Sequence, residues 1–154
     1  MPMKTKAATY VLLFALLIGA TGLLGCAEEA GFTYEDLGRE LSSVEARDVH
    51  AEIARPPFIG APVTEAPELR HSALISLREQ GAEQAELANL LTEMFPQEAR
   101  SVPYYAEAAT VDGTSVWIVL EAWGTESESL DNGRTWVLDR NSGEIMTSVT
   151  YKLQ

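Results

Sequence analysis

The sequence predicts an α+β fold in which one long helix packs on a four-stranded antiparallel meander. Apolar residues recur at helical spacing between Pro67 and Phe95. After Pro103 the apolar period changes to two, and turn residues divide that region into four strand-like segments. The composition, 46% hydrophobic and 22% charged, is typical of a globular domain. Cys26 is the only cysteine, so no disulfide within the chain contributes to stability.

Residues 1–25 have the layout of a secretory signal peptide. Lys4 and Lys6 precede the uncharged stretch 7–24, whose densest apolar run is 11–18. A short basic start followed by an apolar segment is typical of such signals. Because positive flanks stay in the cytoplasm, the rest of the chain is expected outside it.

The end of this stretch, Leu23-Leu24-Gly25-Cys26, resembles the lipobox of bacterial lipoproteins. That pattern has an apolar residue three positions before the cysteine and a small residue directly before it; Leu24 is bulkier than the small residue usual at its position. The resemblance implies cleavage after Gly25 and diacylglycerylation of the Cys26 thiol, and several acyl chains anchor a protein stably. Ala27, in place of the aspartate that resembles an inner-membrane retention signal, favours the outer membrane in an organism with two membranes.

Two other interpretations of the N-terminal segment stay open. Its 18 uncharged residues approach the roughly 20 that a membrane-spanning helix needs, although Gly19, Gly22 and Gly25 weaken it as a helix. Cys26 can also be a thiol without any role in anchoring. The anchored interpretations all place the remaining chain on the extracytoplasmic side.

Residues 26–66 are expected to form a tether. Within it, three apolar residues at helical spacing predict a short helix over 33–48: Leu37, Leu41 and Val44. Four prolines over 54–67 exclude regular helix and predict an extended linker. Phe58 and Ile59 are expected to pack onto the folded domain.

Residues 67–154 are expected to form that domain, beginning with the long helix. Gly81 interrupts its apolar stripe, so the pattern fits one helix or two with a bend at that position. Pro96 ends it. The apolar face predicted to enter the core consists of Leu69, Ala73, Leu77, Ala88, Leu91 and Phe95.

Two hairpins are predicted after the helix. The first joins 103–111 to 115–123 through Asp112-Gly113-Thr114, and the second joins 134–139 to 144–152 through the polar turn 140–143. One face of this sheet is expected to cover the helix. The other is expected to face water or the N-terminal segment.

Residues 136–151 resemble the closing hairpin of PepSY domains, which are small extracytoplasmic modules with a helix packed on an antiparallel sheet. Asp139 and Gly143 match the aspartate, turn and glycine that precede the last strand of that family. The resemblance implies a protein-binding or protease-restraining module. Four strands after the helix depart from the usual three, and a cystatin-like helix and meander has the same order of elements.

The candidate binding face consists of Trp117, Glu121 and Trp123. Alternation in 115–123 places these residues on one side and the apolar residues 116, 118, 120 and 122 on the other, which is expected to meet the helix. Two tryptophans beside a carboxylate on a face away from the core are typical of a binding surface. Glu107 joins Glu121 on this face when the turn is bulged or has three residues, and lies on the opposite face when it has two.

Composition and motifs exclude several classes of function. Without residues 1–25 the chain has 9 Lys+Arg against 23 Asp+Glu, a net charge of −14 that repels phosphate backbones, so no nucleic-acid partner is expected. His50 and His71 lack metal-ligand spacing, and no Gly-x-Ser-x-Gly elbow occurs. We therefore expect no cofactor, no metal and no catalytic set. A Glu107/Glu121 acid–base pair is the weakest of the interpretations considered.

The sequence thus predicts a lipid-anchored cell-envelope protein that binds a protein or peptide without catalysis. It is expected to be attached to the membrane through acylated Cys26. Two alternatives stay open. One is a small-ligand-binding protein with a pocket between helix and sheet, and the other is a structural spacer lipoprotein.

Overall fold

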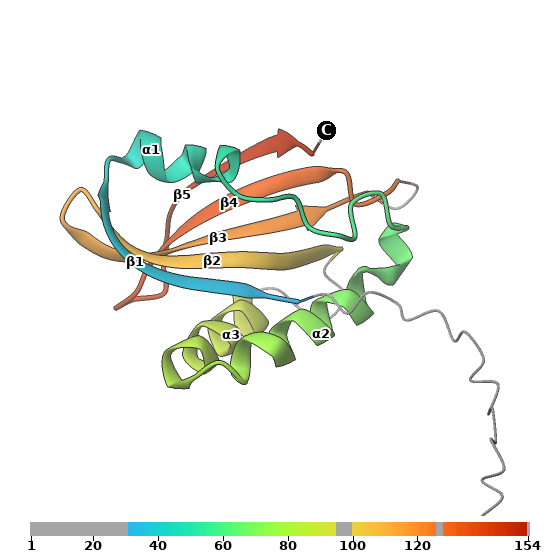
Figure 1. Cartoon of the computed structure of the whole chain (residues 1–154), viewed down its shortest axis with the longest axis horizontal. Helices are drawn as coiled ribbons and strands as arrows, with labels where there is room; N and C mark the ends of the chain where they lie inside the picture. Colours follow the sequence, from blue (N-terminus) through green and yellow to red (C-terminus); the bar gives the residue numbers. More distant parts are fainter. Residues whose placement is uncertain (1–30, 95–99, 126–127, 154) are drawn as a thin grey trace, which may run out of the picture.

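A five-stranded mixed sheet forms the centre of the structure, a computed structural model that describes residues 31–94, 100–125 and 128–153 (Figure 1). Its order is β1-β2-β3-β4-β5. β1 runs parallel to β2, and the other neighbouring strands are antiparallel. The expected four-stranded antiparallel meander is therefore wrong, because a fifth, parallel strand is present. The strands are β1 (Thr33–Leu41), β2 (Ser101–Val111), β3 (Thr114–Trp123), β4 (Asn132–Asp139) and β5 (Ile145–Lys152).

Strand β1 occupies residues that were expected to begin a short helix in the tether. The helical stripe is not buried, since Leu37 is 52% and Val44 57% exposed. Tyr34 and Leu41 instead pack against the core from the strand, and the backbone pairs with the free edge of β2. Sheet pairing outweighs a weak helical pattern here. The helix α1 (Ser43–Asp48) begins only after Ser42, which forms a capping box with Glu45.

The proline-rich segment also belongs to the folded domain. The 3₁₀ turn η1 (Val49–Ala51) precedes this segment, and η2 (Val63–Glu65) lies within it. Phe58 is 8% exposed and meets the Tyr104 ring edge-on, with ring centroids 6.4 Å apart. The predicted packing of Phe58 is thus confirmed. Residues 33–65, expected to be tether, are part of the same domain as the sheet.

The expected long helix is two helices, α2 (Ala66–Arg78) and α3 (Ala82–Met94). The chain turns at Gly81, whose φ of +154° is a backbone conformation that residues with side chains rarely adopt. The turn lets α3 fold back beside α2, so both helices pack on the sheet (Figure 1). The expected end at Pro96 lies outside the described residues, as does Phe95.

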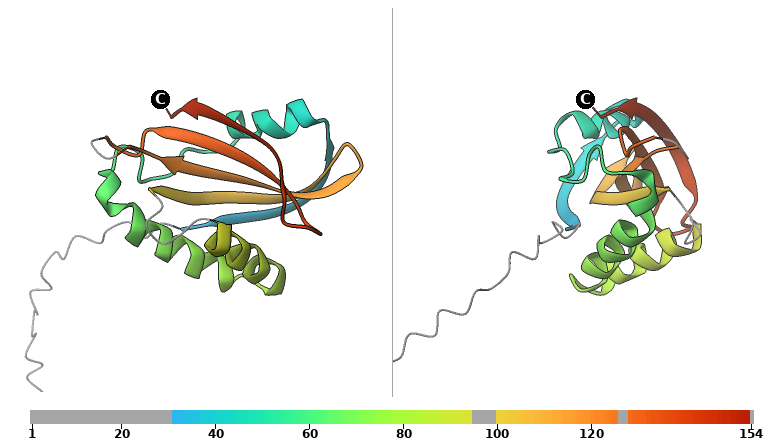
Figure 2. Two further views of the ribbon diagram at one scale, coloured as in Figure 1. Left: turned by 180° about the vertical axis from the view of Figure 1, so that it is seen from behind. Right: turned by 90° about the vertical axis from the view of Figure 1, so that its right-hand side faces the viewer.

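The sheet is the middle of three layers (Figures 1 and 2). On one face Trp117 of β3 contacts Glu83 of α3. On the opposite face Tyr151 of β5 stacks on His50 of η1, with ring centroids 3.7 Å apart. The segment from α1 to η2 therefore covers the face that α2 and α3 leave free. Consequently the central strands β2 and β3 are buried on both sides.

Both predicted hairpins are present. Val111 pairs with Thr114, so the first turn has two residues; Asp112 (φ +49°) and Gly113 (φ +83°) both have the positive φ of a type I′ turn. In the second, Asp139 Oδ1 accepts hydrogen bonds from two backbone N–H groups of the turn, at 2.7 and 2.9 Å. None of the helices in the described ranges is long and apolar enough to cross a bilayer.

Candidate functional site

The predicted lipidation site lies outside the described residues. Leu23, Leu24, Gly25 and Cys26 all precede residue 31, so acylation of Cys26 stays a prediction. The first residue held by the domain is Phe32, whose carbonyl oxygen accepts a hydrogen bond of 2.8 Å from the Gln80 side chain. Five residues lie between Cys26 and Phe32, so their Cα atoms are at most about 22 Å apart.

The predicted binding face of Trp117, Glu121 and Trp123 packs into the core. Trp117 and Glu121 are each 2% exposed, and Trp123 is partly buried. Trp117 Nε1 donates to Glu83 of α3 at 3.4 Å. The prediction that these residues lie on a face away from the helices was therefore wrong. Both faces of β3 are apolar enough to be buried, so alternation alone did not show which one meets α2 and α3.

Glu121 joins two arginines in this buried layer. Arg134 Nη1 lies 3.4 Å from Glu121 Oε1, and its guanidinium lies over the rings of Trp123 and Trp136, 5.0 and 4.9 Å from their centroids. Burial raises the pKa of the Glu121 carboxyl, and its contacts with Trp136, Arg134, Ser101 and Arg70 oppose that rise. These contacts connect β3 with β4, β2 and α2, which is a structural role.

Glu107 lies on the other face of the sheet because the first hairpin has a two-residue turn. It pairs in register with Ile118 rather than sharing a side with Glu121. Its side chain is fully buried, and both carboxylate oxygens accept hydrogen bonds from Arg39. Tyr105 Oη donates to it at 2.8 Å. The Glu107/Glu121 acid–base pair is thus excluded by the register.

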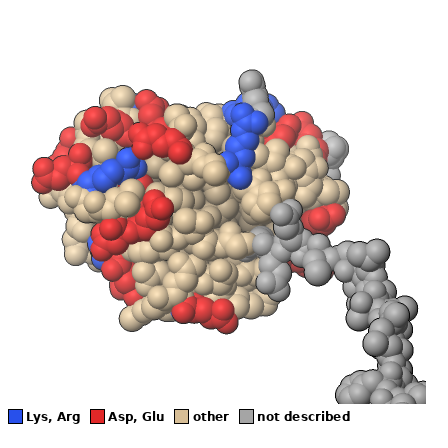
Figure 3. All heavy atoms as spheres, in the orientation of Figure 1, with Lys and Arg blue, Asp and Glu red and all other residues tan. Residues whose placement is uncertain are grey.

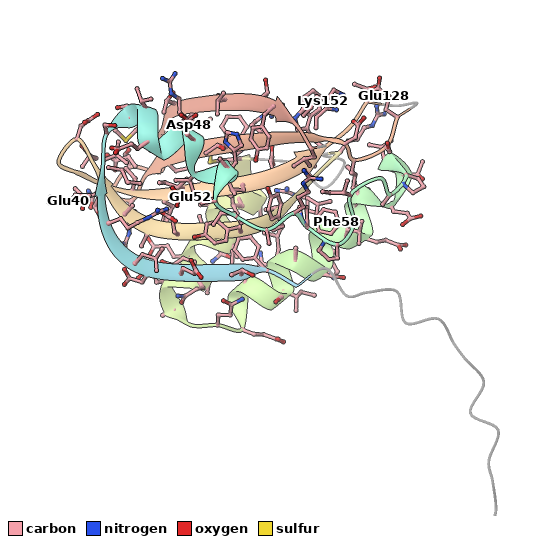
Figure 4. All side chains as sticks on the ribbon, turned by 45° about the horizontal axis from the view of Figure 1, so that its top comes forward. Glu40, Asp48, Glu52, Phe58, Glu128 and Lys152 are labelled. Atoms are coloured by element: carbon pink, nitrogen blue, oxygen red, sulfur yellow. The ribbon has the colours of Figure 1, made fainter. Side chains whose placement is uncertain are left out.

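The strongest candidate site is a cleft between the end of β5 and the segment that follows η1. Its volume is about 300 Å³, at the lower end of pockets that hold small molecules. Lys152 lies at the end of β5, and Glu52 and Phe58 lie on the segment that crosses this face (Figure 4). The cleft is lined by His50, Ala51, Ile53, Arg55, Tyr104, Tyr151, Lys152 and Leu153.

Tyrosine hydroxyl groups line the inner part of this cleft. Tyr104 Oη and Tyr151 Oη are 3.4 Å apart, longer than the usual 2.7–2.8 Å of a hydrogen bond between hydroxyls. Burial raises the pKa of both tyrosines, so each hydroxyl stays protonated near neutral pH and can donate. At Tyr151, hydrogen bonds with Tyr104 and Thr135 oppose part of this rise. These hydroxyls therefore have capacity for a further polar group.

The cations around the cleft are only weakly engaged. The exposed Arg55 forms no hydrogen bond or ion pair with the described residues. Lys152 makes one exposed pair with Asp131, at 3.4 Å. His50 Nδ1 donates to the Arg47 carbonyl oxygen at 2.9 Å, which leaves Nε2 without a partner in the described part of the chain. The cleft is thus a set of donors and positive charges with no acidic side chain in its lining.

Sequence reasoning missed this site because its residues come from three separate segments of the chain. His50 and Arg55 lie in the stretch 26–66 that was predicted to be a tether, and Tyr104 and Tyr151 lie in different hairpins. The signal that existed was the expected packing of Phe58 on the domain, which places the neighbouring residues against the sheet. The hydrophobic pattern of the sequence did not indicate that the chain changes direction at η1 and η2.

Comparison with known protein families, curated proteins and solved structures found no match. Within the described ranges no group of three or more His, Cys, Asp or Glu is arranged to hold a metal ion.

Proposed function

We propose that this protein is a lipid-anchored, non-catalytic binding module on the extracytoplasmic side of a membrane. The observation that carries the proposal is Cys26, directly after Gly25, at the end of a basic start and an uncharged segment. Cleavage before Cys26 would leave only a short link to the domain. The domain would thus be held close to the bilayer surface, with its cleft available to ligands there.

The binding part of the proposal rests on the cleft. Its lining offers hydroxyl, imidazole, guanidinium and ammonium groups and contains no carboxylate, a set suited to holding a ligand. The Tyr104 hydroxyl contacts the Tyr151 hydroxyl, and the Tyr151 ring stacks on His50. These groups are therefore positioned before a ligand arrives.

The experiment that tests the proposal compares membrane attachment of the wild type and Cys26→Ser in cells of a bacterium with lipoprotein processing. The wild type is expected in the membrane fraction, resistant to high salt and released by detergent. Cys26→Ser is expected to lose acylation and to retain residues 1–25, which a shift in gel mobility reports. A matched Ser43→Ala variant controls for expression. Identical processing of the wild type and Cys26→Ser would contradict the proposal.

A second candidate function is protein or peptide binding at the edge of β5. In the sheet β5 pairs only with β4, and Ile145 and Met146 are 46% and 45% exposed. An unpaired edge with exposed apolar side chains accepts an added strand. Crosslinking in intact membranes tests this: partners captured by the wild type should be lost from Ile145→Lys/Met146→Lys. Retention of the same partners would exclude the edge.

A further inference from the structure

The charge around the cleft is opposite in sign to that of the chain as a whole. After residue 25 the chain has a net charge of −14, yet the charged residues among the eight that line the cleft are Arg55 and Lys152, and none is acidic. Figure 3 shows acidic side chains gathered mainly at the left end of the visible face, and a strip of basic atoms near the C-terminal end of β5. A second recess, about 280 Å³ and lined in part by Glu40 and Asp112, has the opposite character. An anion approaching this surface is therefore favoured at the cleft.

The nearest acidic groups leave the cations free to act. Glu52 is committed to Arg39 at 2.8 Å. Asp131 pairs with Lys152, but both side chains are well exposed, 40% and 59%, and such pairs contribute little. Arg55 is not engaged by any described residue. A guanidinium and an ammonium are thus available at the mouth of the cleft.

The inner part of the cleft offers donors of fixed position next to an apolar wall. Tyr104 is 7% exposed, and the partly buried Tyr151 is held by the stacking of His50 on its ring. Ala51, Ile53 and Leu153 complete the lining with carbon atoms only in their side chains. A planar group with two acceptor oxygens and a short apolar body matches this combination, since carboxylates accept several hydrogen bonds and pair with arginine.

From this arrangement we propose that the cleft binds a small carboxylate, with Arg55 and Lys152 attracting the charge and the hydroxyls of Tyr104 and Tyr151 donating to its oxygens. The proposal deepens the proposed function and rests on its binding part. Such a carboxylate has two sources, a free organic acid and the C-terminus of a peptide. The volume of about 300 Å³ holds a free acid of few atoms, or only the terminal portion of a peptide.

Titration of the full-length protein, purified in detergent, with sodium benzoate tests the proposal by ¹H–¹⁵N NMR. Benzamide is the matched uncharged probe. Benzoate is expected to shift the amides of residues 50–55 and 151–153 in a saturable manner, and benzamide is expected to shift them far less. Arg55→Ala should weaken benzoate binding about tenfold or more, because a hydrogen bond to a charged group is lost.

The control variant is Arg78→Ala, which removes a cation of α2 whose contacts are with Asn89 and Thr92 on α3. It should leave benzoate binding unchanged. A six-residue peptide with a free C-terminus is compared with its C-terminal amide. Tighter binding of the free peptide than of benzoate assigns the carboxylate to a peptide terminus, and weaker binding assigns it to a free acid.

Equal shifts with benzoate and benzamide would overturn the proposal. So would benzoate affinity that is the same in the wild type, Arg55→Ala and Arg78→Ala. This failure is distinguishable from failure of the anchoring proposal, because membrane attachment and processing at Cys26 are measured separately and do not depend on the cleft.

Discussion

Replacing Arg39 by methionine tests how β1, the strand next to the predicted anchor, is held in the sheet. Arg39 Nη2 donates to both oxygens of Glu107, at 2.7 and 2.9 Å, and Nε donates at 3.2 Å. Its Nη1 also pairs with Glu52 at 2.8 Å. The hydrogen bonds to Glu107 are the largest cause of the raised pKa of the Arg39 guanidinium. One side chain therefore joins β1 to β2 and to the segment above the sheet.

The expected loss follows from the burial of Glu107. Removing one partner of a buried ion pair costs about 3–5 kcal/mol, because the other charge is left uncompensated. Glu107 is fully buried, but the Arg39 side chain is 26% exposed, so water reaches that side. Tyr105 Oη still donates to the carboxylate. We therefore expect the lower end, about 3 kcal/mol, which is a large share of the 5–15 kcal/mol typical of a domain.

Urea unfolding followed by tryptophan fluorescence measures this loss. The matched control is Glu52→Gln, which breaks the other contact of Arg39 at a side chain 66% exposed; it should cost at most about 1 kcal/mol. Adding Glu107→Gln to Arg39→Met should recover part of the loss, since the stranded carboxylate is removed. An Arg39→Met cost no larger than that of Glu52→Gln would refute the reasoning.

Three further changes have defined outcomes. Burial raises the pKa of Glu121 above 4.5, so the folded state holds this proton more tightly than the unfolded chain and the contribution of the group to stability falls as pH rises above 4.5. Glu121→Gln lacks this loss, so the free energy of unfolding of the wild type should fall relative to that of Glu121→Gln as pH rises above 4.5; a relative rise would contradict the assignment. At Gly133 an added Cβ would lie 2.1 Å from the Tyr151 ring, so Gly133→Ala should displace Tyr151 and weaken benzoate binding, and unchanged affinity and stability would show that the ring is not held there. Phe58→Ala should cost about 3–5 kcal/mol in urea unfolding, as a buried aromatic does, and a cost below about 1 kcal/mol would mean that the segment is not packed on Tyr104.

The sequence pattern correctly predicted those elements whose signals are local. Asp112-Gly113-Thr114 predicts a hairpin turn but leaves its length open, and the structure has a two-residue turn at Asp112 and Gly113. Gly81 marked the point where the helical region divides. The four strands after the helices were found because their alternation is regular.

What failed depended on distant contacts. β1 is a strand because the edge of β2 accepts it, which nothing in residues 33–41 reveals. The faces of β3 were exchanged because Trp117 and Val119 are as apolar as Ile118, so periodicity does not say which helix meets which side. The cleft requires His50 and Tyr151 to stack across 101 residues of chain, and no local pattern encodes such a contact.

Mass spectrometry of the N-terminal peptide of the purified protein tests the central claim, attachment through Cys26, most directly. The account predicts a peptide that begins at Cys26, lacks residues 1–25 and has the added mass of a diacylglyceryl group and its acyl chains. A peptide that retains residues before Cys26, or that begins at Cys26 with an unmodified thiol, would contradict it.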